Sequence, residues 1–188
     1  GTLGDACLAL QALQGQVTLP PELLERARQR LEWPTPRVAL GQALRGVASA
    51  ALDVSDGLLG DLGHVLRASG VGAEIDVAAT SDLIAARACL QRLEGLFGSK
   101  FGAAFASTEE LAQRCILAGG DDYELAFTAA PEKRPALATL AARLDLPLWR
   151  IGWTRALHDT PPGVTVLDAD GQPLSLNHAG FDHFAQKT

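Results

Sequence analysis

The spacing of apolar and polar residues divides the chain into helices and strands. Apolar residues recur every three to four positions, the spacing of an amphipathic helix, in residues 6–13, 23–31, 38–44, 58–69, 83–93, 107–118 and 131–144. Short apolar runs or strict alternation predict strands over residues 48–54, 72–77, 123–128, 148–154 and 164–167. Residues 94–106 have no clear period, and we expect them to form a loop. Strands mixed with helices predict an α+β (layered α/β) fold, in which helices cover a mixed sheet.

Local signals mark several ends of these elements. Asp5 is positioned to cap the first helix, and Ser81-Asp82 to cap the helix that follows them. Residues 107–110 match a capping box, in which a serine and a glutamate each accept a backbone N–H of the helix start. Asp170-Gly171 is a strong hairpin signal after the last predicted strand. Arg30, like the other arginines of the second helix, is expected on its solvent face.

The most informative stretch is residues 48–57, an apolar run that ends abruptly in polar residues. Asp53, Ser55 and Asp56 follow the apolar run directly, and a helical pattern comes after them. These side chains therefore lie on a strand-to-helix turn, where open α/β sheets bind ligands. Two neighbouring carboxylates are unfavourable unless a cation or N–H donors lie between them. Serine and aspartate are also preferred N-cap residues, so a purely structural capping role fits the same turn.

A second acidic turn contains Asp121, Asp122 and Glu124, directly after two glycines. Carboxylate oxygens on turns suit Mg²⁺, which takes one or two carboxylates together with substrate phosphates. Glycines let backbone N–H groups approach a phosphate, and a serine hydroxyl can donate to one. We therefore expect both acidic turns to converge on one pocket that shares cations with a polyphosphate. The alternative is that both turns only carry helix caps.

Composition and charge exclude several classes of function. The chain has 188 residues, so we expect a single domain over residues 1–188. The net charge of −6, without a block of lysines and arginines, argues against binding of nucleic acid. Apolar stretches are too short to span a membrane, no signal peptide is visible, and three cysteines without metal-ligand spacing are typical of a cytoplasmic protein. No Ser-His-Asp set and no Walker A loop appear, so no catalytic side chain is predicted.

Five groups of residues form a set that extends over nearly the whole chain: residues 1–6, 53–64, 69–73, 119–125 and 180–184. Taken together, these groups resemble the thiamine-monophosphate kinase family. They occur in the family's order, which makes the set specific although each motif alone is weak.

The resemblance implies a two-domain enzyme of the aminoimidazole-ribonucleotide-synthetase superfamily, to whose C-terminal domain this chain is similar. Enzymes of this family transfer the γ-phosphoryl group of ATP to thiamine monophosphate with the help of Mg²⁺, and thiamine diphosphate is the product. The family's N-terminal domain supplies most metal and nucleotide ligands and the main dimer contact, and this chain lacks it. We therefore expect this chain to be inactive alone and the full-length enzyme to be a homodimer.

The resemblance also implies roles at the first acidic turn. Asp53 and Asp56 are expected to bind magnesium, and Ser55 to contact ATP. Phosphoryl transfer needs positioning and charge neutralisation more than a nucleophilic side chain, which agrees with carboxylates at this turn.

For the thiamine substrate, the resemblance implies contacts from Glu124 and Phe181. An aromatic face beside a cationic thiazolium ring is physically favourable. Asp121 and Asp122 are candidates for additional site residues.

Two other interpretations fit the same residues. The chain could belong to another ATP-dependent kinase or synthetase of the superfamily that acts on a different small molecule. It could also be a non-catalytic binding or assembly module, in which the acidic turns only cap helices.

Overall fold

The computed structural model describes residues 1–87, 90–91, 107–157 and 161–174. Cys89, the predicted loop over residues 94–106 and Phe181 lie outside these described residues. The helices are α1 (Asp5–Leu13), α2 (Pro21–Glu32), α3 (Val38–Ala43), α4 (Leu58–Ser69), α5 (Val77–Thr80), α7 (Thr108–Ala118) and α8 (Arg134–Leu144), with a 3₁₀ turn, η1 (Pro131–Lys133), before α8. The strands are β1 (Ala50–Val54), β2 (Val71–Asp76), β3 (Glu124–Thr128), β4 (Gly152–Ala156) and β5 (Gly163–Leu167).

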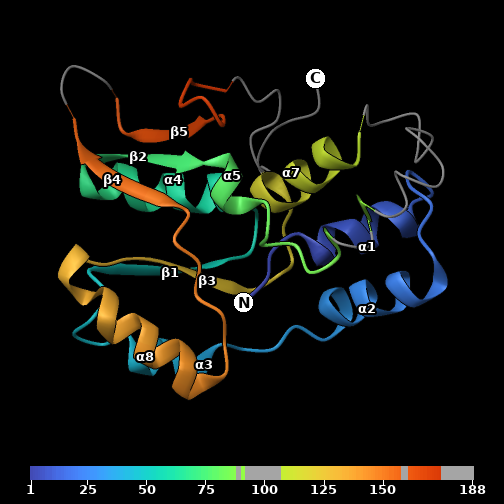
Figure 1. Ribbon diagram of the computed structural model, residues 1–188, viewed down its shortest axis with the longest axis horizontal. Helices are drawn as coiled ribbons and strands as arrows, with labels where there is room; N and C mark the ends of the chain where they lie inside the picture. Colours follow the sequence, from blue (N-terminus) through green and yellow to red (C-terminus); the bar gives the residue numbers. More distant parts are fainter. Residues whose placement is uncertain (88–89, 92–106, 158–160, 175–188) are drawn as a thin grey trace.

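The strands form two sheets. β1 and β3 pair antiparallel, and the second sheet has the order β4-β2-β5, with β4 antiparallel and β5 parallel to β2. Figure 1 shows the two sheets as separate layers, with α3 and α8 beneath the β1–β3 sheet and α1 and α2 at one end of the molecule. α4 contacts β1, β2 and β5 and thus links the two sheets. Mixed pairing covered by helices confirms the predicted α+β class.

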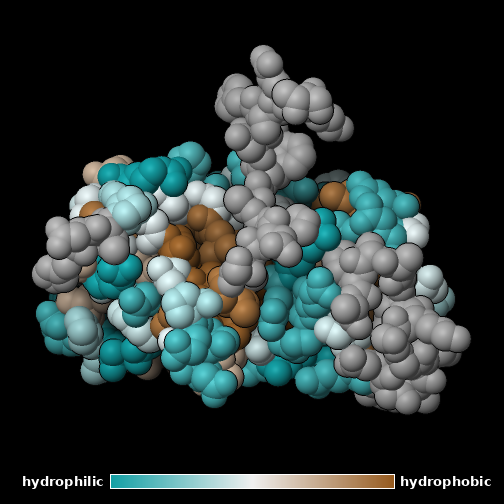
Figure 2. All heavy atoms as spheres, turned by 90° about the horizontal axis from the view of Figure 1, so that it is seen from above, coloured by the Kyte–Doolittle hydropathy of each residue, from teal (hydrophilic) through white to brown (hydrophobic). Residues whose placement is uncertain are grey.

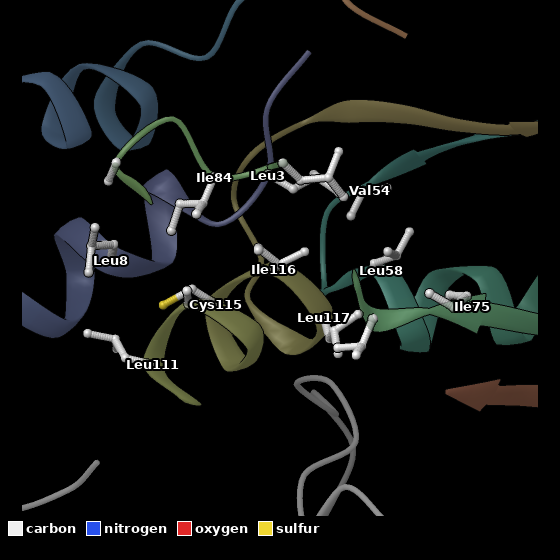
Figure 3. Packing of buried hydrophobic residues seen from close by; sticks show 14 of the residues in the cluster. Leu3, Leu8, Val54, Leu58, Ile75, Ile84, Leu111, Cys115, Ile116 and Leu117 are labelled. Carbon is white, nitrogen blue, oxygen red and sulfur yellow. The ribbon is translucent and has the colours of Figure 1, made fainter. Parts of the chain in front are cut away.

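The hydrophobic core lies where α1, α4 and α7 meet β2. Leu58, Leu62 and Leu66 are buried at intervals of four residues, so they form one apolar face of α4. This face packs in the same cluster as Ile75 of β2 and Ile116 of α7, and Figure 3 shows the labelled side chains of these elements gathered there. Burial of each such side chain contributes about 1.5–3 kcal/mol. α4 is therefore held firmly, together with the turn that precedes it.

Several predicted boundaries are confirmed. The Ser107 hydroxyl accepts the N–H of Glu110 at 3.1 Å and caps α7, as the capping box predicts. α4 ends at Ser69, and the next residue, Gly70, has a positive φ of 64° that suits a helix C-cap. After β5, Gly171 takes a φ of 75° in a tight turn that brings Pro173 back to Leu167.

Other boundaries differ from the prediction. Ser81-Asp82 do not begin a helix, because residues 81–86 form turns and a bend, with one irregular position at 84. The nearby helix is instead α5, where the Asp76 carboxylate accepts N–H groups of its first turn. β4 begins at Gly152 rather than at residue 148, because the preceding residues cross from one sheet layer to the other (Figure 1). On that crossing, Trp149 Nε1 donates to the Gly1 carbonyl oxygen at 3.0 Å.

β1 is less buried than an interior strand. Val54 is buried, whereas Ala51 and Asp53 are exposed. Among the described strands, β1 pairs only with β3, and alternate side chains of a strand point to opposite faces. One face of this small sheet therefore remains open at Asp53, the residue with which the first acidic turn begins.

On the side that carries β5, hydrophobic residues gather in a hollow bordered by hydrophilic ones (Figure 2). None of the helices in the described part of the chain is long and apolar enough to cross a membrane.

Candidate functional site

The two acidic turns lie side by side. Asp121 N donates to the Ser55 carbonyl oxygen at 2.9 Å, and Tyr123 N donates to the Val54 carbonyl oxygen at 3.0 Å. Gly120 makes this approach possible, because a Cβ atom there would collide with the Ser55 carbonyl oxygen. Sixty-five residues of sequence thus separate two segments that the β1–β3 pairing brings into backbone contact.

The side chains of these turns point in different directions. In the β1–β3 register, Val54 is opposite Glu124 and Asp53 is opposite Leu125. Residues directly opposite each other share a face of the sheet, and their neighbours lie on the other face. Asp53 and Glu124 therefore face opposite sides of the sheet, so the structure does not bring these two carboxylates together in one pocket.

The first turn is shaped by Asp61 of α4. Its Oδ2 atom accepts the N–H of Ser55 at 2.8 Å and the N–H of Asp56 at 3.0 Å. The N-cap residue of α4 is Gly57, and no side chain caps that helix. The capping alternative is therefore wrong for Asp53 and Ser55.

Asp122 has a structural role that the sequence does not reveal. Its carboxylate is fully buried and accepts the N–H of Gly4 at 2.6 Å and that of Ala6 at 3.2 Å, so it caps α1 from more than a hundred residues away. Burial raises the pKa of Asp122 to about 7, although the two N–H donors act in the opposite direction. This carboxylate faces the interior and not a cavity that a metal ion could enter from solvent.

The prediction that Asp5 caps α1 is wrong. Its buried carboxylate accepts the N–H of Ala85 at 3.1 Å and that of Ala86 at 3.2 Å. Burial raises the pKa of Asp5 as well, against these two bonds. Two buried carboxylates thus hold the start of α1 in place. Asp122 accepts N–H groups from it, and Asp5, its first residue, accepts N–H groups from residues 85 and 86.

Glu124 is held by two arginines. Arg37 binds it with both arms of its guanidinium, Nε to Oε2 at 2.8 Å and Nη2 to Oε1 at 2.6 Å. Arg30 Nη2 donates to Oε1 at 2.8 Å. Burial alone would raise the pKa of Glu124, but the hydrogen bond from Arg37 and the charges around the carboxylate outweigh it and lower the pKa. Glu124 is therefore ionised at neutral pH.

Sequence reasoning missed both arginines. The predicted place of Arg30 on the solvent face of its helix is wrong, because its side chain is 19% exposed and paired with Glu124. Arg37 follows a proline-rich link and carries no signal of its own. Their partner lies 87 to 94 residues away, so no local spacing could have revealed the pairs.

A cavity of about 520 Å³ adjoins Glu124. It lies between the β1–β3 sheet on one side and β2 with β4 on the other, and its wall is mostly apolar. Val54, Ala126 and Trp149 contribute to this wall, and Trp153 stands at it with an exposed fraction of 46%. The arrangement offers a carboxylate that two arginines hold in place beside aromatic and aliphatic surface, which suits a flat aromatic ring.

The described residues offer few ligands for a metal ion. Among the described residues, no group of three or more histidine, cysteine, aspartate or glutamate side chains could hold a metal ion. Asp53, which the sequence placed on the turn, is an exposed residue of β1, and Asp56 lies on the turn that follows. Two carboxylates so placed suit a Mg²⁺ ion that takes its other ligands from phosphates or other protein groups.

The fold and the first acidic turn define a layered α+β domain with carboxylates at a strand-to-helix corner. Residues 4–160 match the family model described as AIR synthase related protein, C-terminal domain, and the chain belongs to this family. A similar curated protein is the thiamine-monophosphate kinase of Salmonella typhimurium, 38% identical over 98% of this chain and 51% of its own length. The chain thus spans about half the length of the curated relatives it matches.

Solved structures agree with this assignment. A crystal structure of thiamine-monophosphate kinase from Stenotrophomonas maltophilia has a TM-score of 0.69 and 44% identity, and the match covers 93% of this chain and 49% of that one. A structure described as AaThiL complexed with AMPPCP and TMP has a TM-score of 0.68 and 28% identity, over 98% of this chain and 49% of that one. The resemblance to thiamine-monophosphate kinases found in the motifs is confirmed.

Proposed function

We propose that this chain is the C-terminal part of a kinase that uses ATP and Mg²⁺ to convert thiamine monophosphate into thiamine diphosphate. The observation that carries the proposal is the backbone contact between the two acidic turns, at 2.9 and 3.0 Å, in a chain whose relatives are thiamine-monophosphate kinases. A structure of one such relative holds an ATP analogue together with TMP.

At the first turn, Asp53 and Asp56 bind Mg²⁺ and Ser55 contacts ATP. The two carboxylates would offset the charge of the phosphates, since Mg²⁺ is held by few carboxylates and by phosphate oxygens. The place of Asp53 near the end of β1 and of Asp56 on the following turn also suits this role, because Asp61 of α4 fixes that turn. Protein groups thus position charges, and no nucleophilic side chain is required.

At the second turn, Glu124 contacts the thiamine ring system. Its carboxylate is ionised and Glu124 lines the cavity, where the amino group of the ring system finds an acceptor. Phe181 contacts the same substrate, although it lies outside the described residues. Asp121, at the junction of the turns, is a further candidate. Asp122 is buried beneath α1, which favours a supporting role for it.

The remaining ligands come from protein outside this chain. The described residues hold no complete metal site, and the chain corresponds to about half of its relatives. We therefore expect residues 1–188 to form one domain that is inactive alone and acts in a cytoplasmic homodimer when joined to an N-terminal ATP-binding half.

A non-catalytic binding module is the second candidate. It is favoured by Asp61 of α4 and Asp122 of the second turn, whose carboxylates accept backbone N–H groups. Another superfamily kinase with a different acceptor is the rival within the same class.

One chimera separates these candidates. This chain replaces the matching half of the Salmonella typhimurium kinase, and ATP consumption is measured with thiamine monophosphate and with other phosphorylated acceptors. We expect turnover with thiamine monophosphate, and Asp56→Asn should reduce kcat at least 100-fold and raise the Mg²⁺ requirement. Asp170→Asn, at the exposed turn after β5, is the control. Preference for another acceptor would favour the rival kinase, and full activity of Asp56→Asn would favour the binding module.

A further inference from the structure

The Glu124 carboxylate is fixed more tightly than charge balance requires. One arginine would neutralise it, yet Arg37 and Arg30 both bind it. The fork of Arg37 bonds to both oxygens, which fixes the plane of the carboxylate and not only its position.

Arg30 fixes the carboxylate from a second direction. The same Nη2 atom that donates to Glu124 also donates to the carbonyl oxygen of Asp122 at 3.1 Å. Arg30 therefore ties the carboxylate to its own turn, two residues upstream. The backbone of that turn is in turn bonded to Val54 and Ser55, so the orientation of Glu124 is linked to the first acidic turn.

The fixed carboxylate lies at a cavity wall. Glu124 is 4% exposed and lines the cavity of about 520 Å³ together with apolar residues such as Val54 and Trp149. A buried ion pair contributes little net stability by itself, because desolvation offsets much of the attraction. A pair of arginines on one carboxylate at a cavity wall is better explained by a requirement for orientation.

We propose that Arg37 and Arg30 are positioning residues, which hold the Glu124 carboxylate in the orientation that receives the thiamine ring system of the substrate. The proposal rests on the proposed function, because it assigns Glu124 to the thiamine substrate. Neither arginine touches the substrate. Arg37 acts through the geometry of its two bonds, so a positive charge alone does not replace it.

The test compares Arg37→Lys with the wild type in the chimera described above. Lysine keeps the charge and loses the fork. We expect KM for thiamine monophosphate to rise about tenfold, the effect of one lost charge-assisted hydrogen bond, with kcat within about twofold and KM for ATP unchanged. Arg28→Lys is the matched control, since Arg28 lies on the same helix as Arg30 in an exposed pair with Glu32, and it should leave all three constants unchanged.

The outcomes distinguish the two proposals. A wild-type chimera without turnover on thiamine monophosphate would overturn the proposed function. Turnover in the wild type with the same KM in Arg37→Lys would overturn the positioning role alone. A merely structural tether predicts lower thermal stability with an unchanged KM, which also overturns the positioning role.

The chain alone supplies a second measurement that does not depend on activity. Carbon-13 NMR follows the titration of the Glu124 carboxyl group in the wild type and in Arg37→Gln. Charged groups near this carboxylate are Arg30, Arg37 and the amino group of Gly1, whose nitrogen lies 4.0 Å from Oε2. We expect the pKa of Glu124 to rise in Arg37→Gln. Burial raises this pKa, and the variant lacks the hydrogen bond and the charge of Arg37 that lower it. An identical pKa of Glu124 in both proteins would show that Arg37 does not bind this carboxylate in solution, and would overturn the positioning role.

Discussion

Replacing Asp122 with alanine is expected to destabilise the fold by about 2–4 kcal/mol. The carboxylate is fully buried and accepts N–H groups of Gly4 and Ala6 at 2.6 and 3.2 Å. Its removal leaves two buried donors without that acceptor, and each unsatisfied donor costs about 1–3 kcal/mol. Relief from burying the carboxylate offsets part of this loss, which gives the range above.

Urea unfolding followed by circular dichroism at pH 7 measures the effect. Asp168→Ala is the matched control, because Asp168 also accepts two backbone N–H groups, in the exposed turn after β5. We expect the control to lose less than about 1 kcal/mol. Equal losses of stability in the two variants, or a loss below about 0.5 kcal/mol in Asp122→Ala, would refute the claim that the buried Asp122 cap stabilises the fold.

The pH dependence gives a second readout of the same residue. Burial raises the pKa of Asp122 from 3.8 to about 7, so the native state binds this proton more tightly than the unfolded chain. The raised pKa of Asp122 therefore adds about 4 kcal/mol to the free energy of unfolding at low pH. This contribution is fully present below about pH 4 and is lost as the pH rises to about 7. An asparagine side chain does not titrate, so the stability of wild type relative to Asp122→Asn should fall over this range. A difference that does not change with pH would contradict the assigned cause.

Three further predictions concern the turns and a helix cap. Gly120→Ala should destabilise the fold by about 1–3 kcal/mol in thermal melting, because its Cβ atom meets a backbone carbonyl oxygen. Gly163→Ala is the control and should show no such loss, because a Cβ atom there meets nothing within 4 Å. Ser107→Ala should lose about 1 kcal/mol of stability in urea unfolding, and an unchanged midpoint would mean that its bond to α7 is not made in solution. Ser55→Ala in the chimera should raise KM for ATP about threefold to tenfold while KM for thiamine monophosphate stays constant, and the opposite pattern would move this residue to the other substrate.

Local pattern was enough for most of the secondary structure. The periodic apolar positions of α4 and α7 and the alternation in β2 lie where the sequence predicted them, because packing of one face against the core dictates each period. The helix predicted from residue 83 fails at its start, since Asp76 caps an earlier short helix and the chain then turns. The late start of β4 has a similar cause, because pairing with β2 and not propensity decides where a strand begins.

The sequence could not reveal those features of the site that depend on hydrogen bonds between residues far apart in the chain. The side-chain role of Asp122 depends on Gly4 and Ala6, and that of Glu124 on two arginines almost a hundred residues away. An acidic residue beside a glycine looks the same in sequence whether it caps a helix, pairs with arginine or binds a metal ion. The prediction that both acidic turns converge on one pocket is wrong for Asp53 and Glu124, although the backbones of the two turns are in contact. The opposite directions of these two side chains follow from a strand register that only the fold reveals.

The central claim is that this chain completes a kinase for thiamine monophosphate. Its most direct test is chromatographic detection of thiamine diphosphate after the chimera is incubated with ATP, Mg²⁺ and thiamine monophosphate. The account predicts one thiamine diphosphate formed for each ATP consumed, and none from this chain alone. A stable, ATP-binding chimera that forms no thiamine diphosphate would contradict it.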